Sequence, residues 1–365
     1  MIVKDEAEVI TRAFNSVKHI VDYYCICDTG STDNTIQVIK DYFKENNLKG
    51  EVHERPWVNF GHNRTECFQL ASGISDYNMT LDADEVFCPF ENGQIKVTSI
   101  VKKLPKFETD SIGVITKLGN IEYPRTQFMK DNLGWEWHFP CHEYVDSPNA
   151  SSVSNLDGVA IYPSNDGARA KDNNTYAKDA LVFEHFLLEN PDNSRAWFYL
   201  AQSYRDSNQY QKSLDALEKV IELDPWDEQV FIALLRKARI YMAMPHSNIE
   251  EVAGYFLAAY QYRPQRAEPL HDLLRHYRLA GQNELAVLVG EAAVKIPLSS
   301  DILFIETELY NYKIKDELSV ALFNVGRVRE SLNYSRQLLR SNLTPEEEKD
   351  RLRSNIKLCL DSLKG

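Results

Sequence analysis

Residues 77–85 read YNMTLDADE, a strand-like run that leads directly into two aspartates, Asp82 and Asp84, spaced one residue apart. Two carboxylates just past the end of a buried strand can together hold a divalent cation. Oxygen ligands suit Mg²⁺ or Mn²⁺, and such a cation would neutralise a diphosphate group. Taken alone, an Asp-x-Asp triplet is more often a solvated turn, so its meaning depends on the sequence around it.

Strand-like and helix-like runs alternate along the first 165 residues or so. Apolar residues at helical spacing indicate the helices, and short runs with strand character lie between them. The sequence predicts helices over residues 5–20, 35–43 and 64–71, and strands over residues 23–27, 51–54 and 77–81. This order favours an α/β fold with a mostly parallel sheet covered by helices. Ligands bind such sheets at the carboxyl ends of the strands, where Asp28 and Asp82 both fall.

The stretch Asp28–Asp33 reads DTGSTD and is dense in turn-forming and helix-capping residues. A helix is predicted from Thr35, so this stretch can supply its cap. A capping turn and a nucleotide-binding turn share geometry, because both lie at a helix N-terminus. Two interpretations of Asp28 therefore stay open, a residue that caps the turn and a residue that faces a nucleotide, and one residue can do both.

Composition excludes several classes of protein. The chain has 365 residues, which favours two domains. Its formal net charge of −13 disfavours a nucleic-acid binder, because an acidic surface repels phosphate backbones. We expect no membrane span, because no apolar run approaches the ~20 residues that one needs. Six cysteines form no dense framework and the printed start shows no signal-peptide core, so we expect a reducing, cytoplasmic location.

From about residue 174 the sequence is nearly continuous helix. Residues 194–225 fit the tetratricopeptide pattern of ~34-residue helical hairpins. Further helical pairs are predicted over residues 228–264, 267–297 and 316–340. Each hairpin must stack on its neighbours to bury its apolar face. The resulting surface would serve a glycan or protein acceptor. The alternatives are a structural buttress and a contact that joins two copies of the chain as a homo-oligomer.

Four motifs in order carry a family resemblance: Met1–Glu6 (MIVKDE), Asp28–Asp33 (DTGSTD), Trp57–Arg64 (WVNFGHNR) and Leu81–Glu85 (LDADE). Together they resemble the family 2 glycosyltransferases of the GT-A fold. The resemblance implies an α/β, Rossmann-like GT-A catalytic domain over residues 1–170, followed by an all-α domain of tetratricopeptide-like repeats over residues 171–365. It implies that a nucleotide-sugar donor binds here, a UDP-sugar being expected, with Mn²⁺ or Mg²⁺ as cofactor.

The resemblance also implies a set of site residues. Asp82, Asp84 and His142 would hold the metal. The donor would lie against Val3, Lys4, Glu6, Asp28, Gly30, Ser31, Asp33, Arg64, Asp82, Arg169 and Lys171. Arg169 and Lys171 belong to the run Asn165–Asp172 (NDGARAKD), which resembles the stretch that closes the catalytic domain in repeat-bearing members of this group. A cation there could clamp the leaving diphosphate. A solvated linker turn is the alternative, above all for Lys171.

The stretch Trp135–Val145 reads WEWHFPCHEYV and contains two His and two Glu residues among aromatics. Its His-Glu pair resembles an element of the same transferases. An inverting transfer needs one carboxylate to accept the proton of the acceptor. Glu143 is the first candidate for this base and Glu136 the second. For His142, a hydrogen-bonded structural histidine is an equally weighted alternative to a metal ligand.

The sequence thus predicts a metal-dependent, inverting glycosyltransferase of the hexosyltransferase type. Two alternatives belong to other classes. The chain could be a non-catalytic repeat adaptor with a degenerate transferase fold, which the intact Asp82–Asp84 and His142–Glu143 pairs argue against. It could also be a nucleotidyltransferase, whose sheet and metal-binding carboxylates are similar, although the DTGSTD turn favours sugar transfer.

Overall fold

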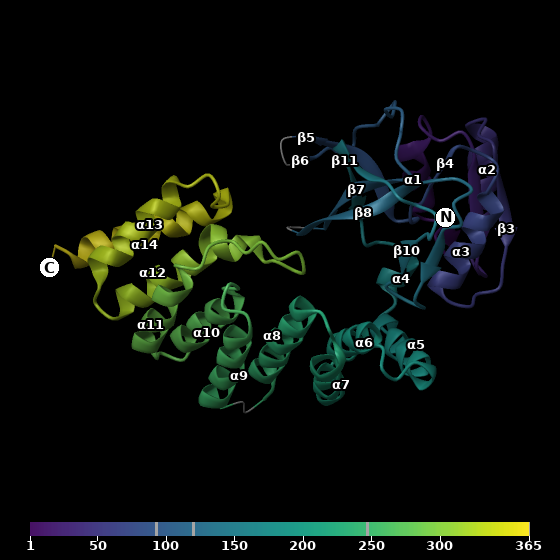
Figure 1. The fold of residues 1–365 in the computed structure, drawn as a ribbon. Helices are drawn as coiled ribbons and strands as arrows, with labels where there is room; N and C mark the ends of the chain where they lie inside the picture. The colour runs from purple at the N-terminus through teal and green to yellow at the C-terminus, as the bar shows by residue number, and fades with distance from the viewer. Residues whose placement is uncertain (92–93, 119–120, 246–247, 365) are drawn as a thin grey trace. The chain divides into compact units, whose positions relative to one another are not determined.

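The computed structural model describes residues 1–91, 94–118, 121–245 and 248–364 and is drawn in Figure 1. The chain forms two compact units, Met1–Phe186 and Leu187–Gly365. The sequence places the boundary near residue 170, whereas the first unit reaches Phe186. The reason lies in helix α5 (Thr175–Glu189), whose first half packs on this unit. Asp179 pairs there with Arg169, and the Phe183 ring lies parallel to that of His142.

The first unit begins with a three-stranded parallel sheet of order β1-β2-β3. Its strands are β1 (Ile2–Val3), β2 (Tyr24–Asp28) and β3 (Gly50–Glu54), and its helices are α1 (Ile10–Val17), α2 (Thr35–Glu45) and α3 (Phe60–Ala71). These elements agree with the predicted ones within a few residues. The register pairs Val3 with Asp28 and Asp28 with Glu54, so the three strands end level with one another. The loops that follow them therefore meet at one edge of the sheet.

A six-stranded sheet of order β4-β8-β7-β11-β5-β6 completes the first unit. Its strands are β4 (Tyr77–Met79), β5 (Glu85–Glu91), β6 (Gln94–Ile95), β7 (Ser111–Leu118), β8 (Ile121–Lys130) and β11 (Val153–Pro163). Only β7 and β11 pair in parallel here. The expected mostly parallel sheet is thus correct for β1–β3 and wrong for this sheet, because the consecutive strands β5 and β6, and β7 and β8, pair directly with each other and run antiparallel.

Helix α1 supplies the centre of the core. Ile10, Ala13, Phe14 and Val17 recur at helical spacing and are buried on one face. The Phe14 ring contacts three further aromatic rings, each with its centroid 5.4 Å away. Full burial of one such side chain is worth about 1.5–3 kcal/mol relative to exposure. This packing holds α1 against β2 and α2, which supply the three rings around Phe14.

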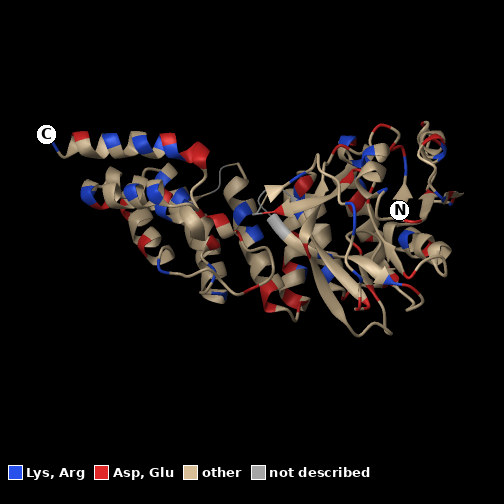
Figure 2. Cartoon of the chain, turned by 90° about the horizontal axis from the view of Figure 1, so that it is seen from above, with Lys and Arg blue, Asp and Glu red and all other residues tan. Residues whose placement is uncertain are grey.

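The second unit is entirely helical among its described residues. Its helices are α6 (Ser194–Asp206), α7 (Tyr210–Leu223), α8 (Asp227–Ala243), α9 (Ile249–Tyr262), α10 (Glu268–Leu279), α11 (Asn283–Ala293), the π-helix η1 (Leu309–Lys313), α12 (Ile314–Asn324), α13 (Val328–Arg340) and α14 (Glu346–Ser362). Consecutive helices pack as hairpins, as the repeat pattern predicts. Figure 2 shows the acidic start of α14, where three glutamates face the positive end of the helix dipole.

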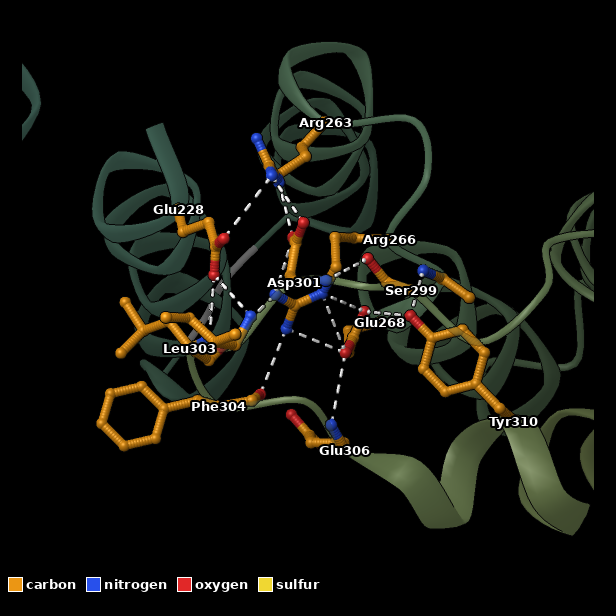
Figure 3. A network of polar contacts seen from close by, with 12 residues as sticks. Glu228, Arg263, Arg266, Glu268, Ser299, Asp301, Leu303, Phe304, Glu306 and Tyr310 are labelled. Carbon is orange, nitrogen blue, oxygen red and sulfur yellow. Dashed lines mark hydrogen bonds and ion pairs between the residues drawn. The ribbon is translucent and has the colours of Figure 1, made fainter. Parts of the chain in front are cut away.

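A buried polar network fixes the long connection between α11 and η1 (Figure 3). Arg266 and Glu268 are fully buried and form an ion pair at 2.9 Å. Arg266 also donates to the carbonyl oxygens of Leu303 and Phe304, each at 3.1 Å. Its Nη1 lies 3.2 Å from the carboxylate of Asp301. The sequence Arg263–Pro269 (RPQRAEP) therefore has a structural role, because it anchors this connection on α10.

The rest of the network comes from neighbouring helices (Figure 3). Arg263 binds Asp301 with two hydrogen bonds of 2.5 and 2.6 Å. Glu228, at the start of α8, accepts hydrogen bonds from the backbone N–H groups of Ile302 and Leu303. These contacts satisfy the charges that burial would otherwise leave unpaired. Among the described residues, no helix is long and apolar enough to cross a membrane.

Candidate active site

The loops after β1 and β2 are joined by hydrogen bonds. Asp5 has a left-handed backbone (φ 58°), and its carboxylate accepts from the backbone N–H of Thr32 at 2.6 Å. In return, the backbone N–H of Asp5 donates to Ser31 Oγ, and that of Glu6 donates to Thr35 Oγ1. This turn is why α1 begins at Ile10 and not at the predicted Asp5. The two loops together form one rigid ledge at the edge of the sheet.

Asp28 serves its own turn. Its Oδ1 accepts from the backbone N–H groups of Gly30 and Ser31, both at 2.9 Å, and the side chain is buried. Gly30 supplies the positive φ of 101° that this turn needs. Of the other residues predicted at the donor, Val3 is buried beneath the turn and Lys4 is exposed beside it. Asp33 caps Thr35, accepting from its backbone N–H at 2.9 Å.

Three carboxylates gather where the loops after β1 and β4 meet the run after β11. Glu6 accepts from the backbone N–H of Ala168. A Cβ built on Gly167 would lie 3.0 Å from Glu6 Oε2 and 3.1 Å from Asp84 Oδ2, so Gly167 lies directly against both acids. Burial, with the nearby charges of Asp84 and Asp82, raises the pKa of Glu6 to about 7. Burial and the charge of Asp82 likewise raise the pKa of Asp84.

Arg64 joins the strand-end acid to the proposed base. Its Nη2 donates to Asp82 Oδ1 at 2.7 Å, and its Nε donates to Glu143 Oε1 at 2.5 Å. The side chains of Arg64 and Glu143 are only 14% and 13% exposed, so the pair is largely shielded from water. Burial works to raise the pKa of Asp82, but the charges of Arg64 and Arg125 outweigh it and hold that pKa below its usual value. The two arginine charges thus favour the ionised form of Asp82.

A second ion pair holds the backbone of Asp82 in place. Arg125, on β8, binds Glu85 with two hydrogen bonds of 2.8 Å. Glu85 is 3% exposed and accepts the backbone N–H of Asp82 at 2.9 Å. The sequence analysis did not identify Arg125. It lies 40 residues from Glu85 in the chain, and no local pattern marks it, so only the pairing of β8 across the sheet reveals its role.

The turn that carries Glu143 has an unusual backbone. Phe139 and His142 both have left-handed φ angles, 81° and 53°. Phe60, at the start of α3, donates its backbone N–H to the carbonyl of Pro140 at 3.0 Å. The next residue must be glycine, because a Cβ on Gly61 would lie 2.4 Å from the carbonyl oxygen of Phe139. The WVNFGHNR motif therefore positions the 139–142 turn, and the turn directs Glu143 at Arg64.

The two candidate bases are placed differently. Glu136 is exposed on β9 (Glu136–His138), opposite Asp146 in the short ribbon that β9 forms with β10 (Tyr144–Asp146). Glu143 follows the turn and is held against Arg64, as described above. Of the two candidates, Glu143 is the one that Arg64 links to Asp82.

His142 lies beside different partners from those that the resemblance implies. A ring nitrogen of His142, the sulfur of Cys141 and a carboxylate oxygen of Asp179 lie within 4.8 Å of one another. Among the described residues, this is the one such group of three possible metal ligands, and it includes neither Asp82 nor Asp84. Burial raises the pKa of the Cys141 thiol to about 12. Neither Cys141 nor Asp179 is marked by the sequence motifs as a companion of His142.

The cations after β11 are both engaged in ion pairs. Arg169 pairs with Asp179 at 2.6 Å, and its guanidinium lies over the Phe60 ring at 4.7 Å. Lys171 pairs with Glu8 at 2.6 Å, where both side chains are exposed. A further pair, Arg12 with Asp166, ties the start of this run to α1. The run that contains Gly167 is therefore fastened over the Glu6 and Asp84 carboxylates from both sides.

Two stretches of the chain match known protein families. Residues 1–136 match the model of glycosyl transferase family 2, and residues 194–225 match that of a tetratricopeptide repeat. The SPbeta prophage-derived glycosyltransferase SunS of Bacillus subtilis is 24% identical over 229 residues, which are 60% of this chain and 52% of that protein. An uncharacterized glycosyltransferase of Rickettsia felis is 35% identical over 85 residues, 23% of this chain and 27% of that one.

Among solved structures, a thermophilic tetratricopeptide repeat protein of Thermus thermophilus is similar to 51% of this chain over 91% of its own, with a TM-score of 0.33 and 18% identity. The chain spans 27% and 52% of the length of the two curated relatives named above. The predicted α/β region followed by helical repeats is confirmed. The chain therefore contains a family 2 glycosyltransferase domain, in residues 1–136, followed by tetratricopeptide repeats.

Proposed function

We propose that this chain transfers a sugar from a nucleotide-diphosphate sugar to an acceptor hydroxyl, with inversion at the anomeric carbon and with a divalent cation as cofactor. The observation that carries the proposal is the Arg64 bridge, which joins Asp82 at the strand end to Glu143 in the turn after β9. It brings the carboxylate expected at the donor next to the carboxylate expected at the acceptor. A transferase needs these two groups in one site.

The residues present fit a hard divalent cation. Glu6, Asp82 and Asp84 offer oxygen ligands, which Mg²⁺ and Mn²⁺ prefer. The raised pKa values of Glu6 and Asp84 reflect burial together with mutual repulsion, which a bound cation would relieve. Asp82 and Asp84 would hold the ion. When bound, it would neutralise charge on the diphosphate leaving group.

The other residues then have separate tasks. Glu143 accepts the proton of the acceptor hydroxyl while that oxygen forms a bond to the anomeric carbon and the sugar–phosphate bond breaks. Arg64 fixes the orientation of Glu143 through a charge-assisted hydrogen bond. The joined loops that contain Asp5 and Asp28 give the nucleotide a rigid ledge, and a UDP-sugar is the donor we test first.

The acceptor, a glycan or a protein, is proposed to bind the helical repeats. Changes on their surface would then raise the Michaelis constant for the acceptor and leave hydrolysis of the donor unchanged. We further propose a cytoplasmic site of action, which is consistent with the six free cysteines.

A panel of nucleotide sugars, incubated with the full chain, tests the proposal. Release of the nucleoside diphosphate is measured with Mn²⁺, with Mg²⁺ and with a chelator. We expect release from one donor, dependent on the cation, and its loss in Asp84→Asn. Gly254→Ala is the control, because Gly254 lies in α9 with nothing within 4 Å of an added Cβ. Absence of release from every donor overturns the proposal and favours a non-catalytic adaptor.

A further inference from the structure

Three side chains outside the proposed carboxylate site form a compact group of possible metal ligands. Cys141 and His142 come from the turn after β9, and Asp179 comes from α5. Their ligand atoms all lie within 4.8 Å of one another. Cys141 is 4% exposed and Asp179 is 5% exposed. Two of the three ligands are therefore shielded from bulk water and His142 is half-buried, unlike a chance cluster of surface acids.

The donor atoms differ in kind from those of the carboxylate site. Sulfur, imidazole nitrogen and one carboxylate oxygen are the ligand types of Zn²⁺, whereas Mg²⁺ and Mn²⁺ prefer oxygen ligands alone. With metal–ligand bonds of about 2.0–2.3 Å, ligand atoms in a tetrahedral site lie about 3.3–3.8 Å apart. Because the ligand atoms lie within 4.8 Å of one another, the group needs a contraction of at most about 1.5 Å, which rotation of side chains can supply. Three protein ligands leave the fourth position to water or another small ligand.

The backbone of the turn is already shaped for this grouping. His142 has a φ of 53° and Phe139 a φ of 81°. Such conformations are strained for non-glycine residues and persist where the surroundings impose them. The surroundings here are the start of α3, through the hydrogen bond from Phe60 to Pro140 and the close approach of Gly61. The left-handed residue lets two adjacent side chains, Cys141 and His142, face the same carboxylate.

Arg169 supplies the outer support that such sites usually have. Its Nη2 donates to Asp179 Oδ2 at 2.6 Å and lies 3.5 Å from the Cys141 sulfur. Among the described residues, Oδ1 of Asp179 has no hydrogen bond, so this oxygen remains available as a ligand. A guanidinium beside a thiolate and a carboxylate offsets part of their charge and orients both. Outer partners of this kind commonly tune metal affinity by about 10–100-fold.

We propose that Cys141, His142 and Asp179 bind a zinc-class divalent ion that fastens the turn before Glu143 to α5. The ion is distinct from the cation at Asp82 and Asp84 in its ligands and in its preference for soft metals. Its role is to position the turn and, through the turn, Glu143. The ion does not contact the sugar that is transferred. The proposal stands on the ligand geometry, so it does not require that the chain transfer a sugar.

Cobalt substitution of the full chain gives a direct test. The protein is stripped with a chelator and titrated with Co²⁺ or Zn²⁺ alone, while visible absorption reports sulfur–cobalt charge transfer and mass spectrometry reports bound metal. We expect a charge-transfer band that saturates near one equivalent and is displaced by Zn²⁺. Cys141→Ser should abolish the band. His142→Asn should weaken binding at least tenfold, and asparagine tolerates the left-handed backbone, so the fold is kept.

Two matched controls separate this site from others. Cys88→Ser removes an equally buried thiol, on β5, and should leave the band unchanged. Asp84→Asn alters the carboxylate site and should also leave it unchanged, whatever its effect on sugar transfer. Absence of the band in the unaltered chain, or a band that survives in both Cys141→Ser and His142→Asn, overturns the proposal. In that case the group is only a structural set of polar contacts among Arg169, Asp179 and Cys141.

Discussion

The guanidinium of Arg64 donates to the carboxylate of Glu143 at 2.5 Å, although 79 residues separate the two in the chain. The bond orients Glu143 and holds it beside Asp82. The position of the Glu143 carboxylate is therefore set by α3 as well as by its own loop.

Replacing Glu143 with glutamine should lower sugar transfer by about 10²–10⁴-fold, because the amide keeps the shape but cannot accept the proton. Donor affinity should change little. The matched control is Glu136→Gln, which alters the exposed carboxylate on β9 and should leave transfer unchanged. Initial rates with a saturating donor and calorimetry of nucleotide binding give the two quantities. The reverse order of effects would assign the base to Glu136.

Arg64→Met should destabilise the first unit strongly. Removing one partner of a buried ion pair costs about 3–5 kcal/mol, since the remaining charges lose their compensation. The comparison is Arg55→Met. This change removes an ion pair with Glu66, which lies on α3 as Arg64 does, and both side chains of the pair are about one-third exposed. That pair should contribute less than about 1 kcal/mol. Denaturant unfolding of both variants measures the difference, and equal losses of stability would show that the Arg64 bridge is not energetically special.

Gly167→Ala should weaken cation binding and leave the fold intact. Gly167 has a φ of −67°, which alanine adopts without strain. The added methyl group would, however, lie 3.0–3.1 Å from carboxylate oxygens of Glu6 and Asp84, which must move by a few tenths of an ångström. We expect sugar transfer to fall about tenfold through this misplacement. Mn²⁺ titration and thermal unfolding give the two readouts, and unchanged Mn²⁺ affinity would remove Gly167 from the site.

Local patterns predicted much of this molecule. The first helices and strands and the repeat hairpins follow from short stretches of sequence, and the same stretches single out Asp82, Arg64 and Glu143 as candidates. The Arg64 bridge itself does not, because nothing local indicates which acids an arginine on α3 will meet. The same holds for Arg125 behind Glu85.

The six-stranded sheet was missed for a related reason. Strands β7, β8 and β11 lie in residues 111–163, where no strand was predicted, and their pairing joins segments far apart in sequence. A register of this kind depends on which faces pack together in the folded unit. The sequence likewise does not predict that Asp179 lies beside His142, because Asp179 enters the group only through the packing of α5 on the first unit.

The stability of the repeat unit should depend on pH through Asp301. Hydrogen bonds from Arg263, and then Arg266, outweigh burial and hold the pKa of Asp301 below its usual value. A carboxylate with a lowered pKa in the folded state contributes stability that is fully present above its unfolded pKa of about 3.9 and is lost as the pH falls through the folded value. We therefore expect the melting temperature of the full chain to fall as the pH drops below about 4, partly through this group. Asp301→Asn should lower stability at pH 7 and flatten that dependence, because it removes the charge while Arg266 stays buried.

Glu330→Gln is the control, since it neutralises an exposed carboxylate paired with Arg327 on the same unit. A melting curve for Asp301→Asn that keeps the full acid dependence of the unaltered chain would show that the network in Figure 3 does not carry the effect.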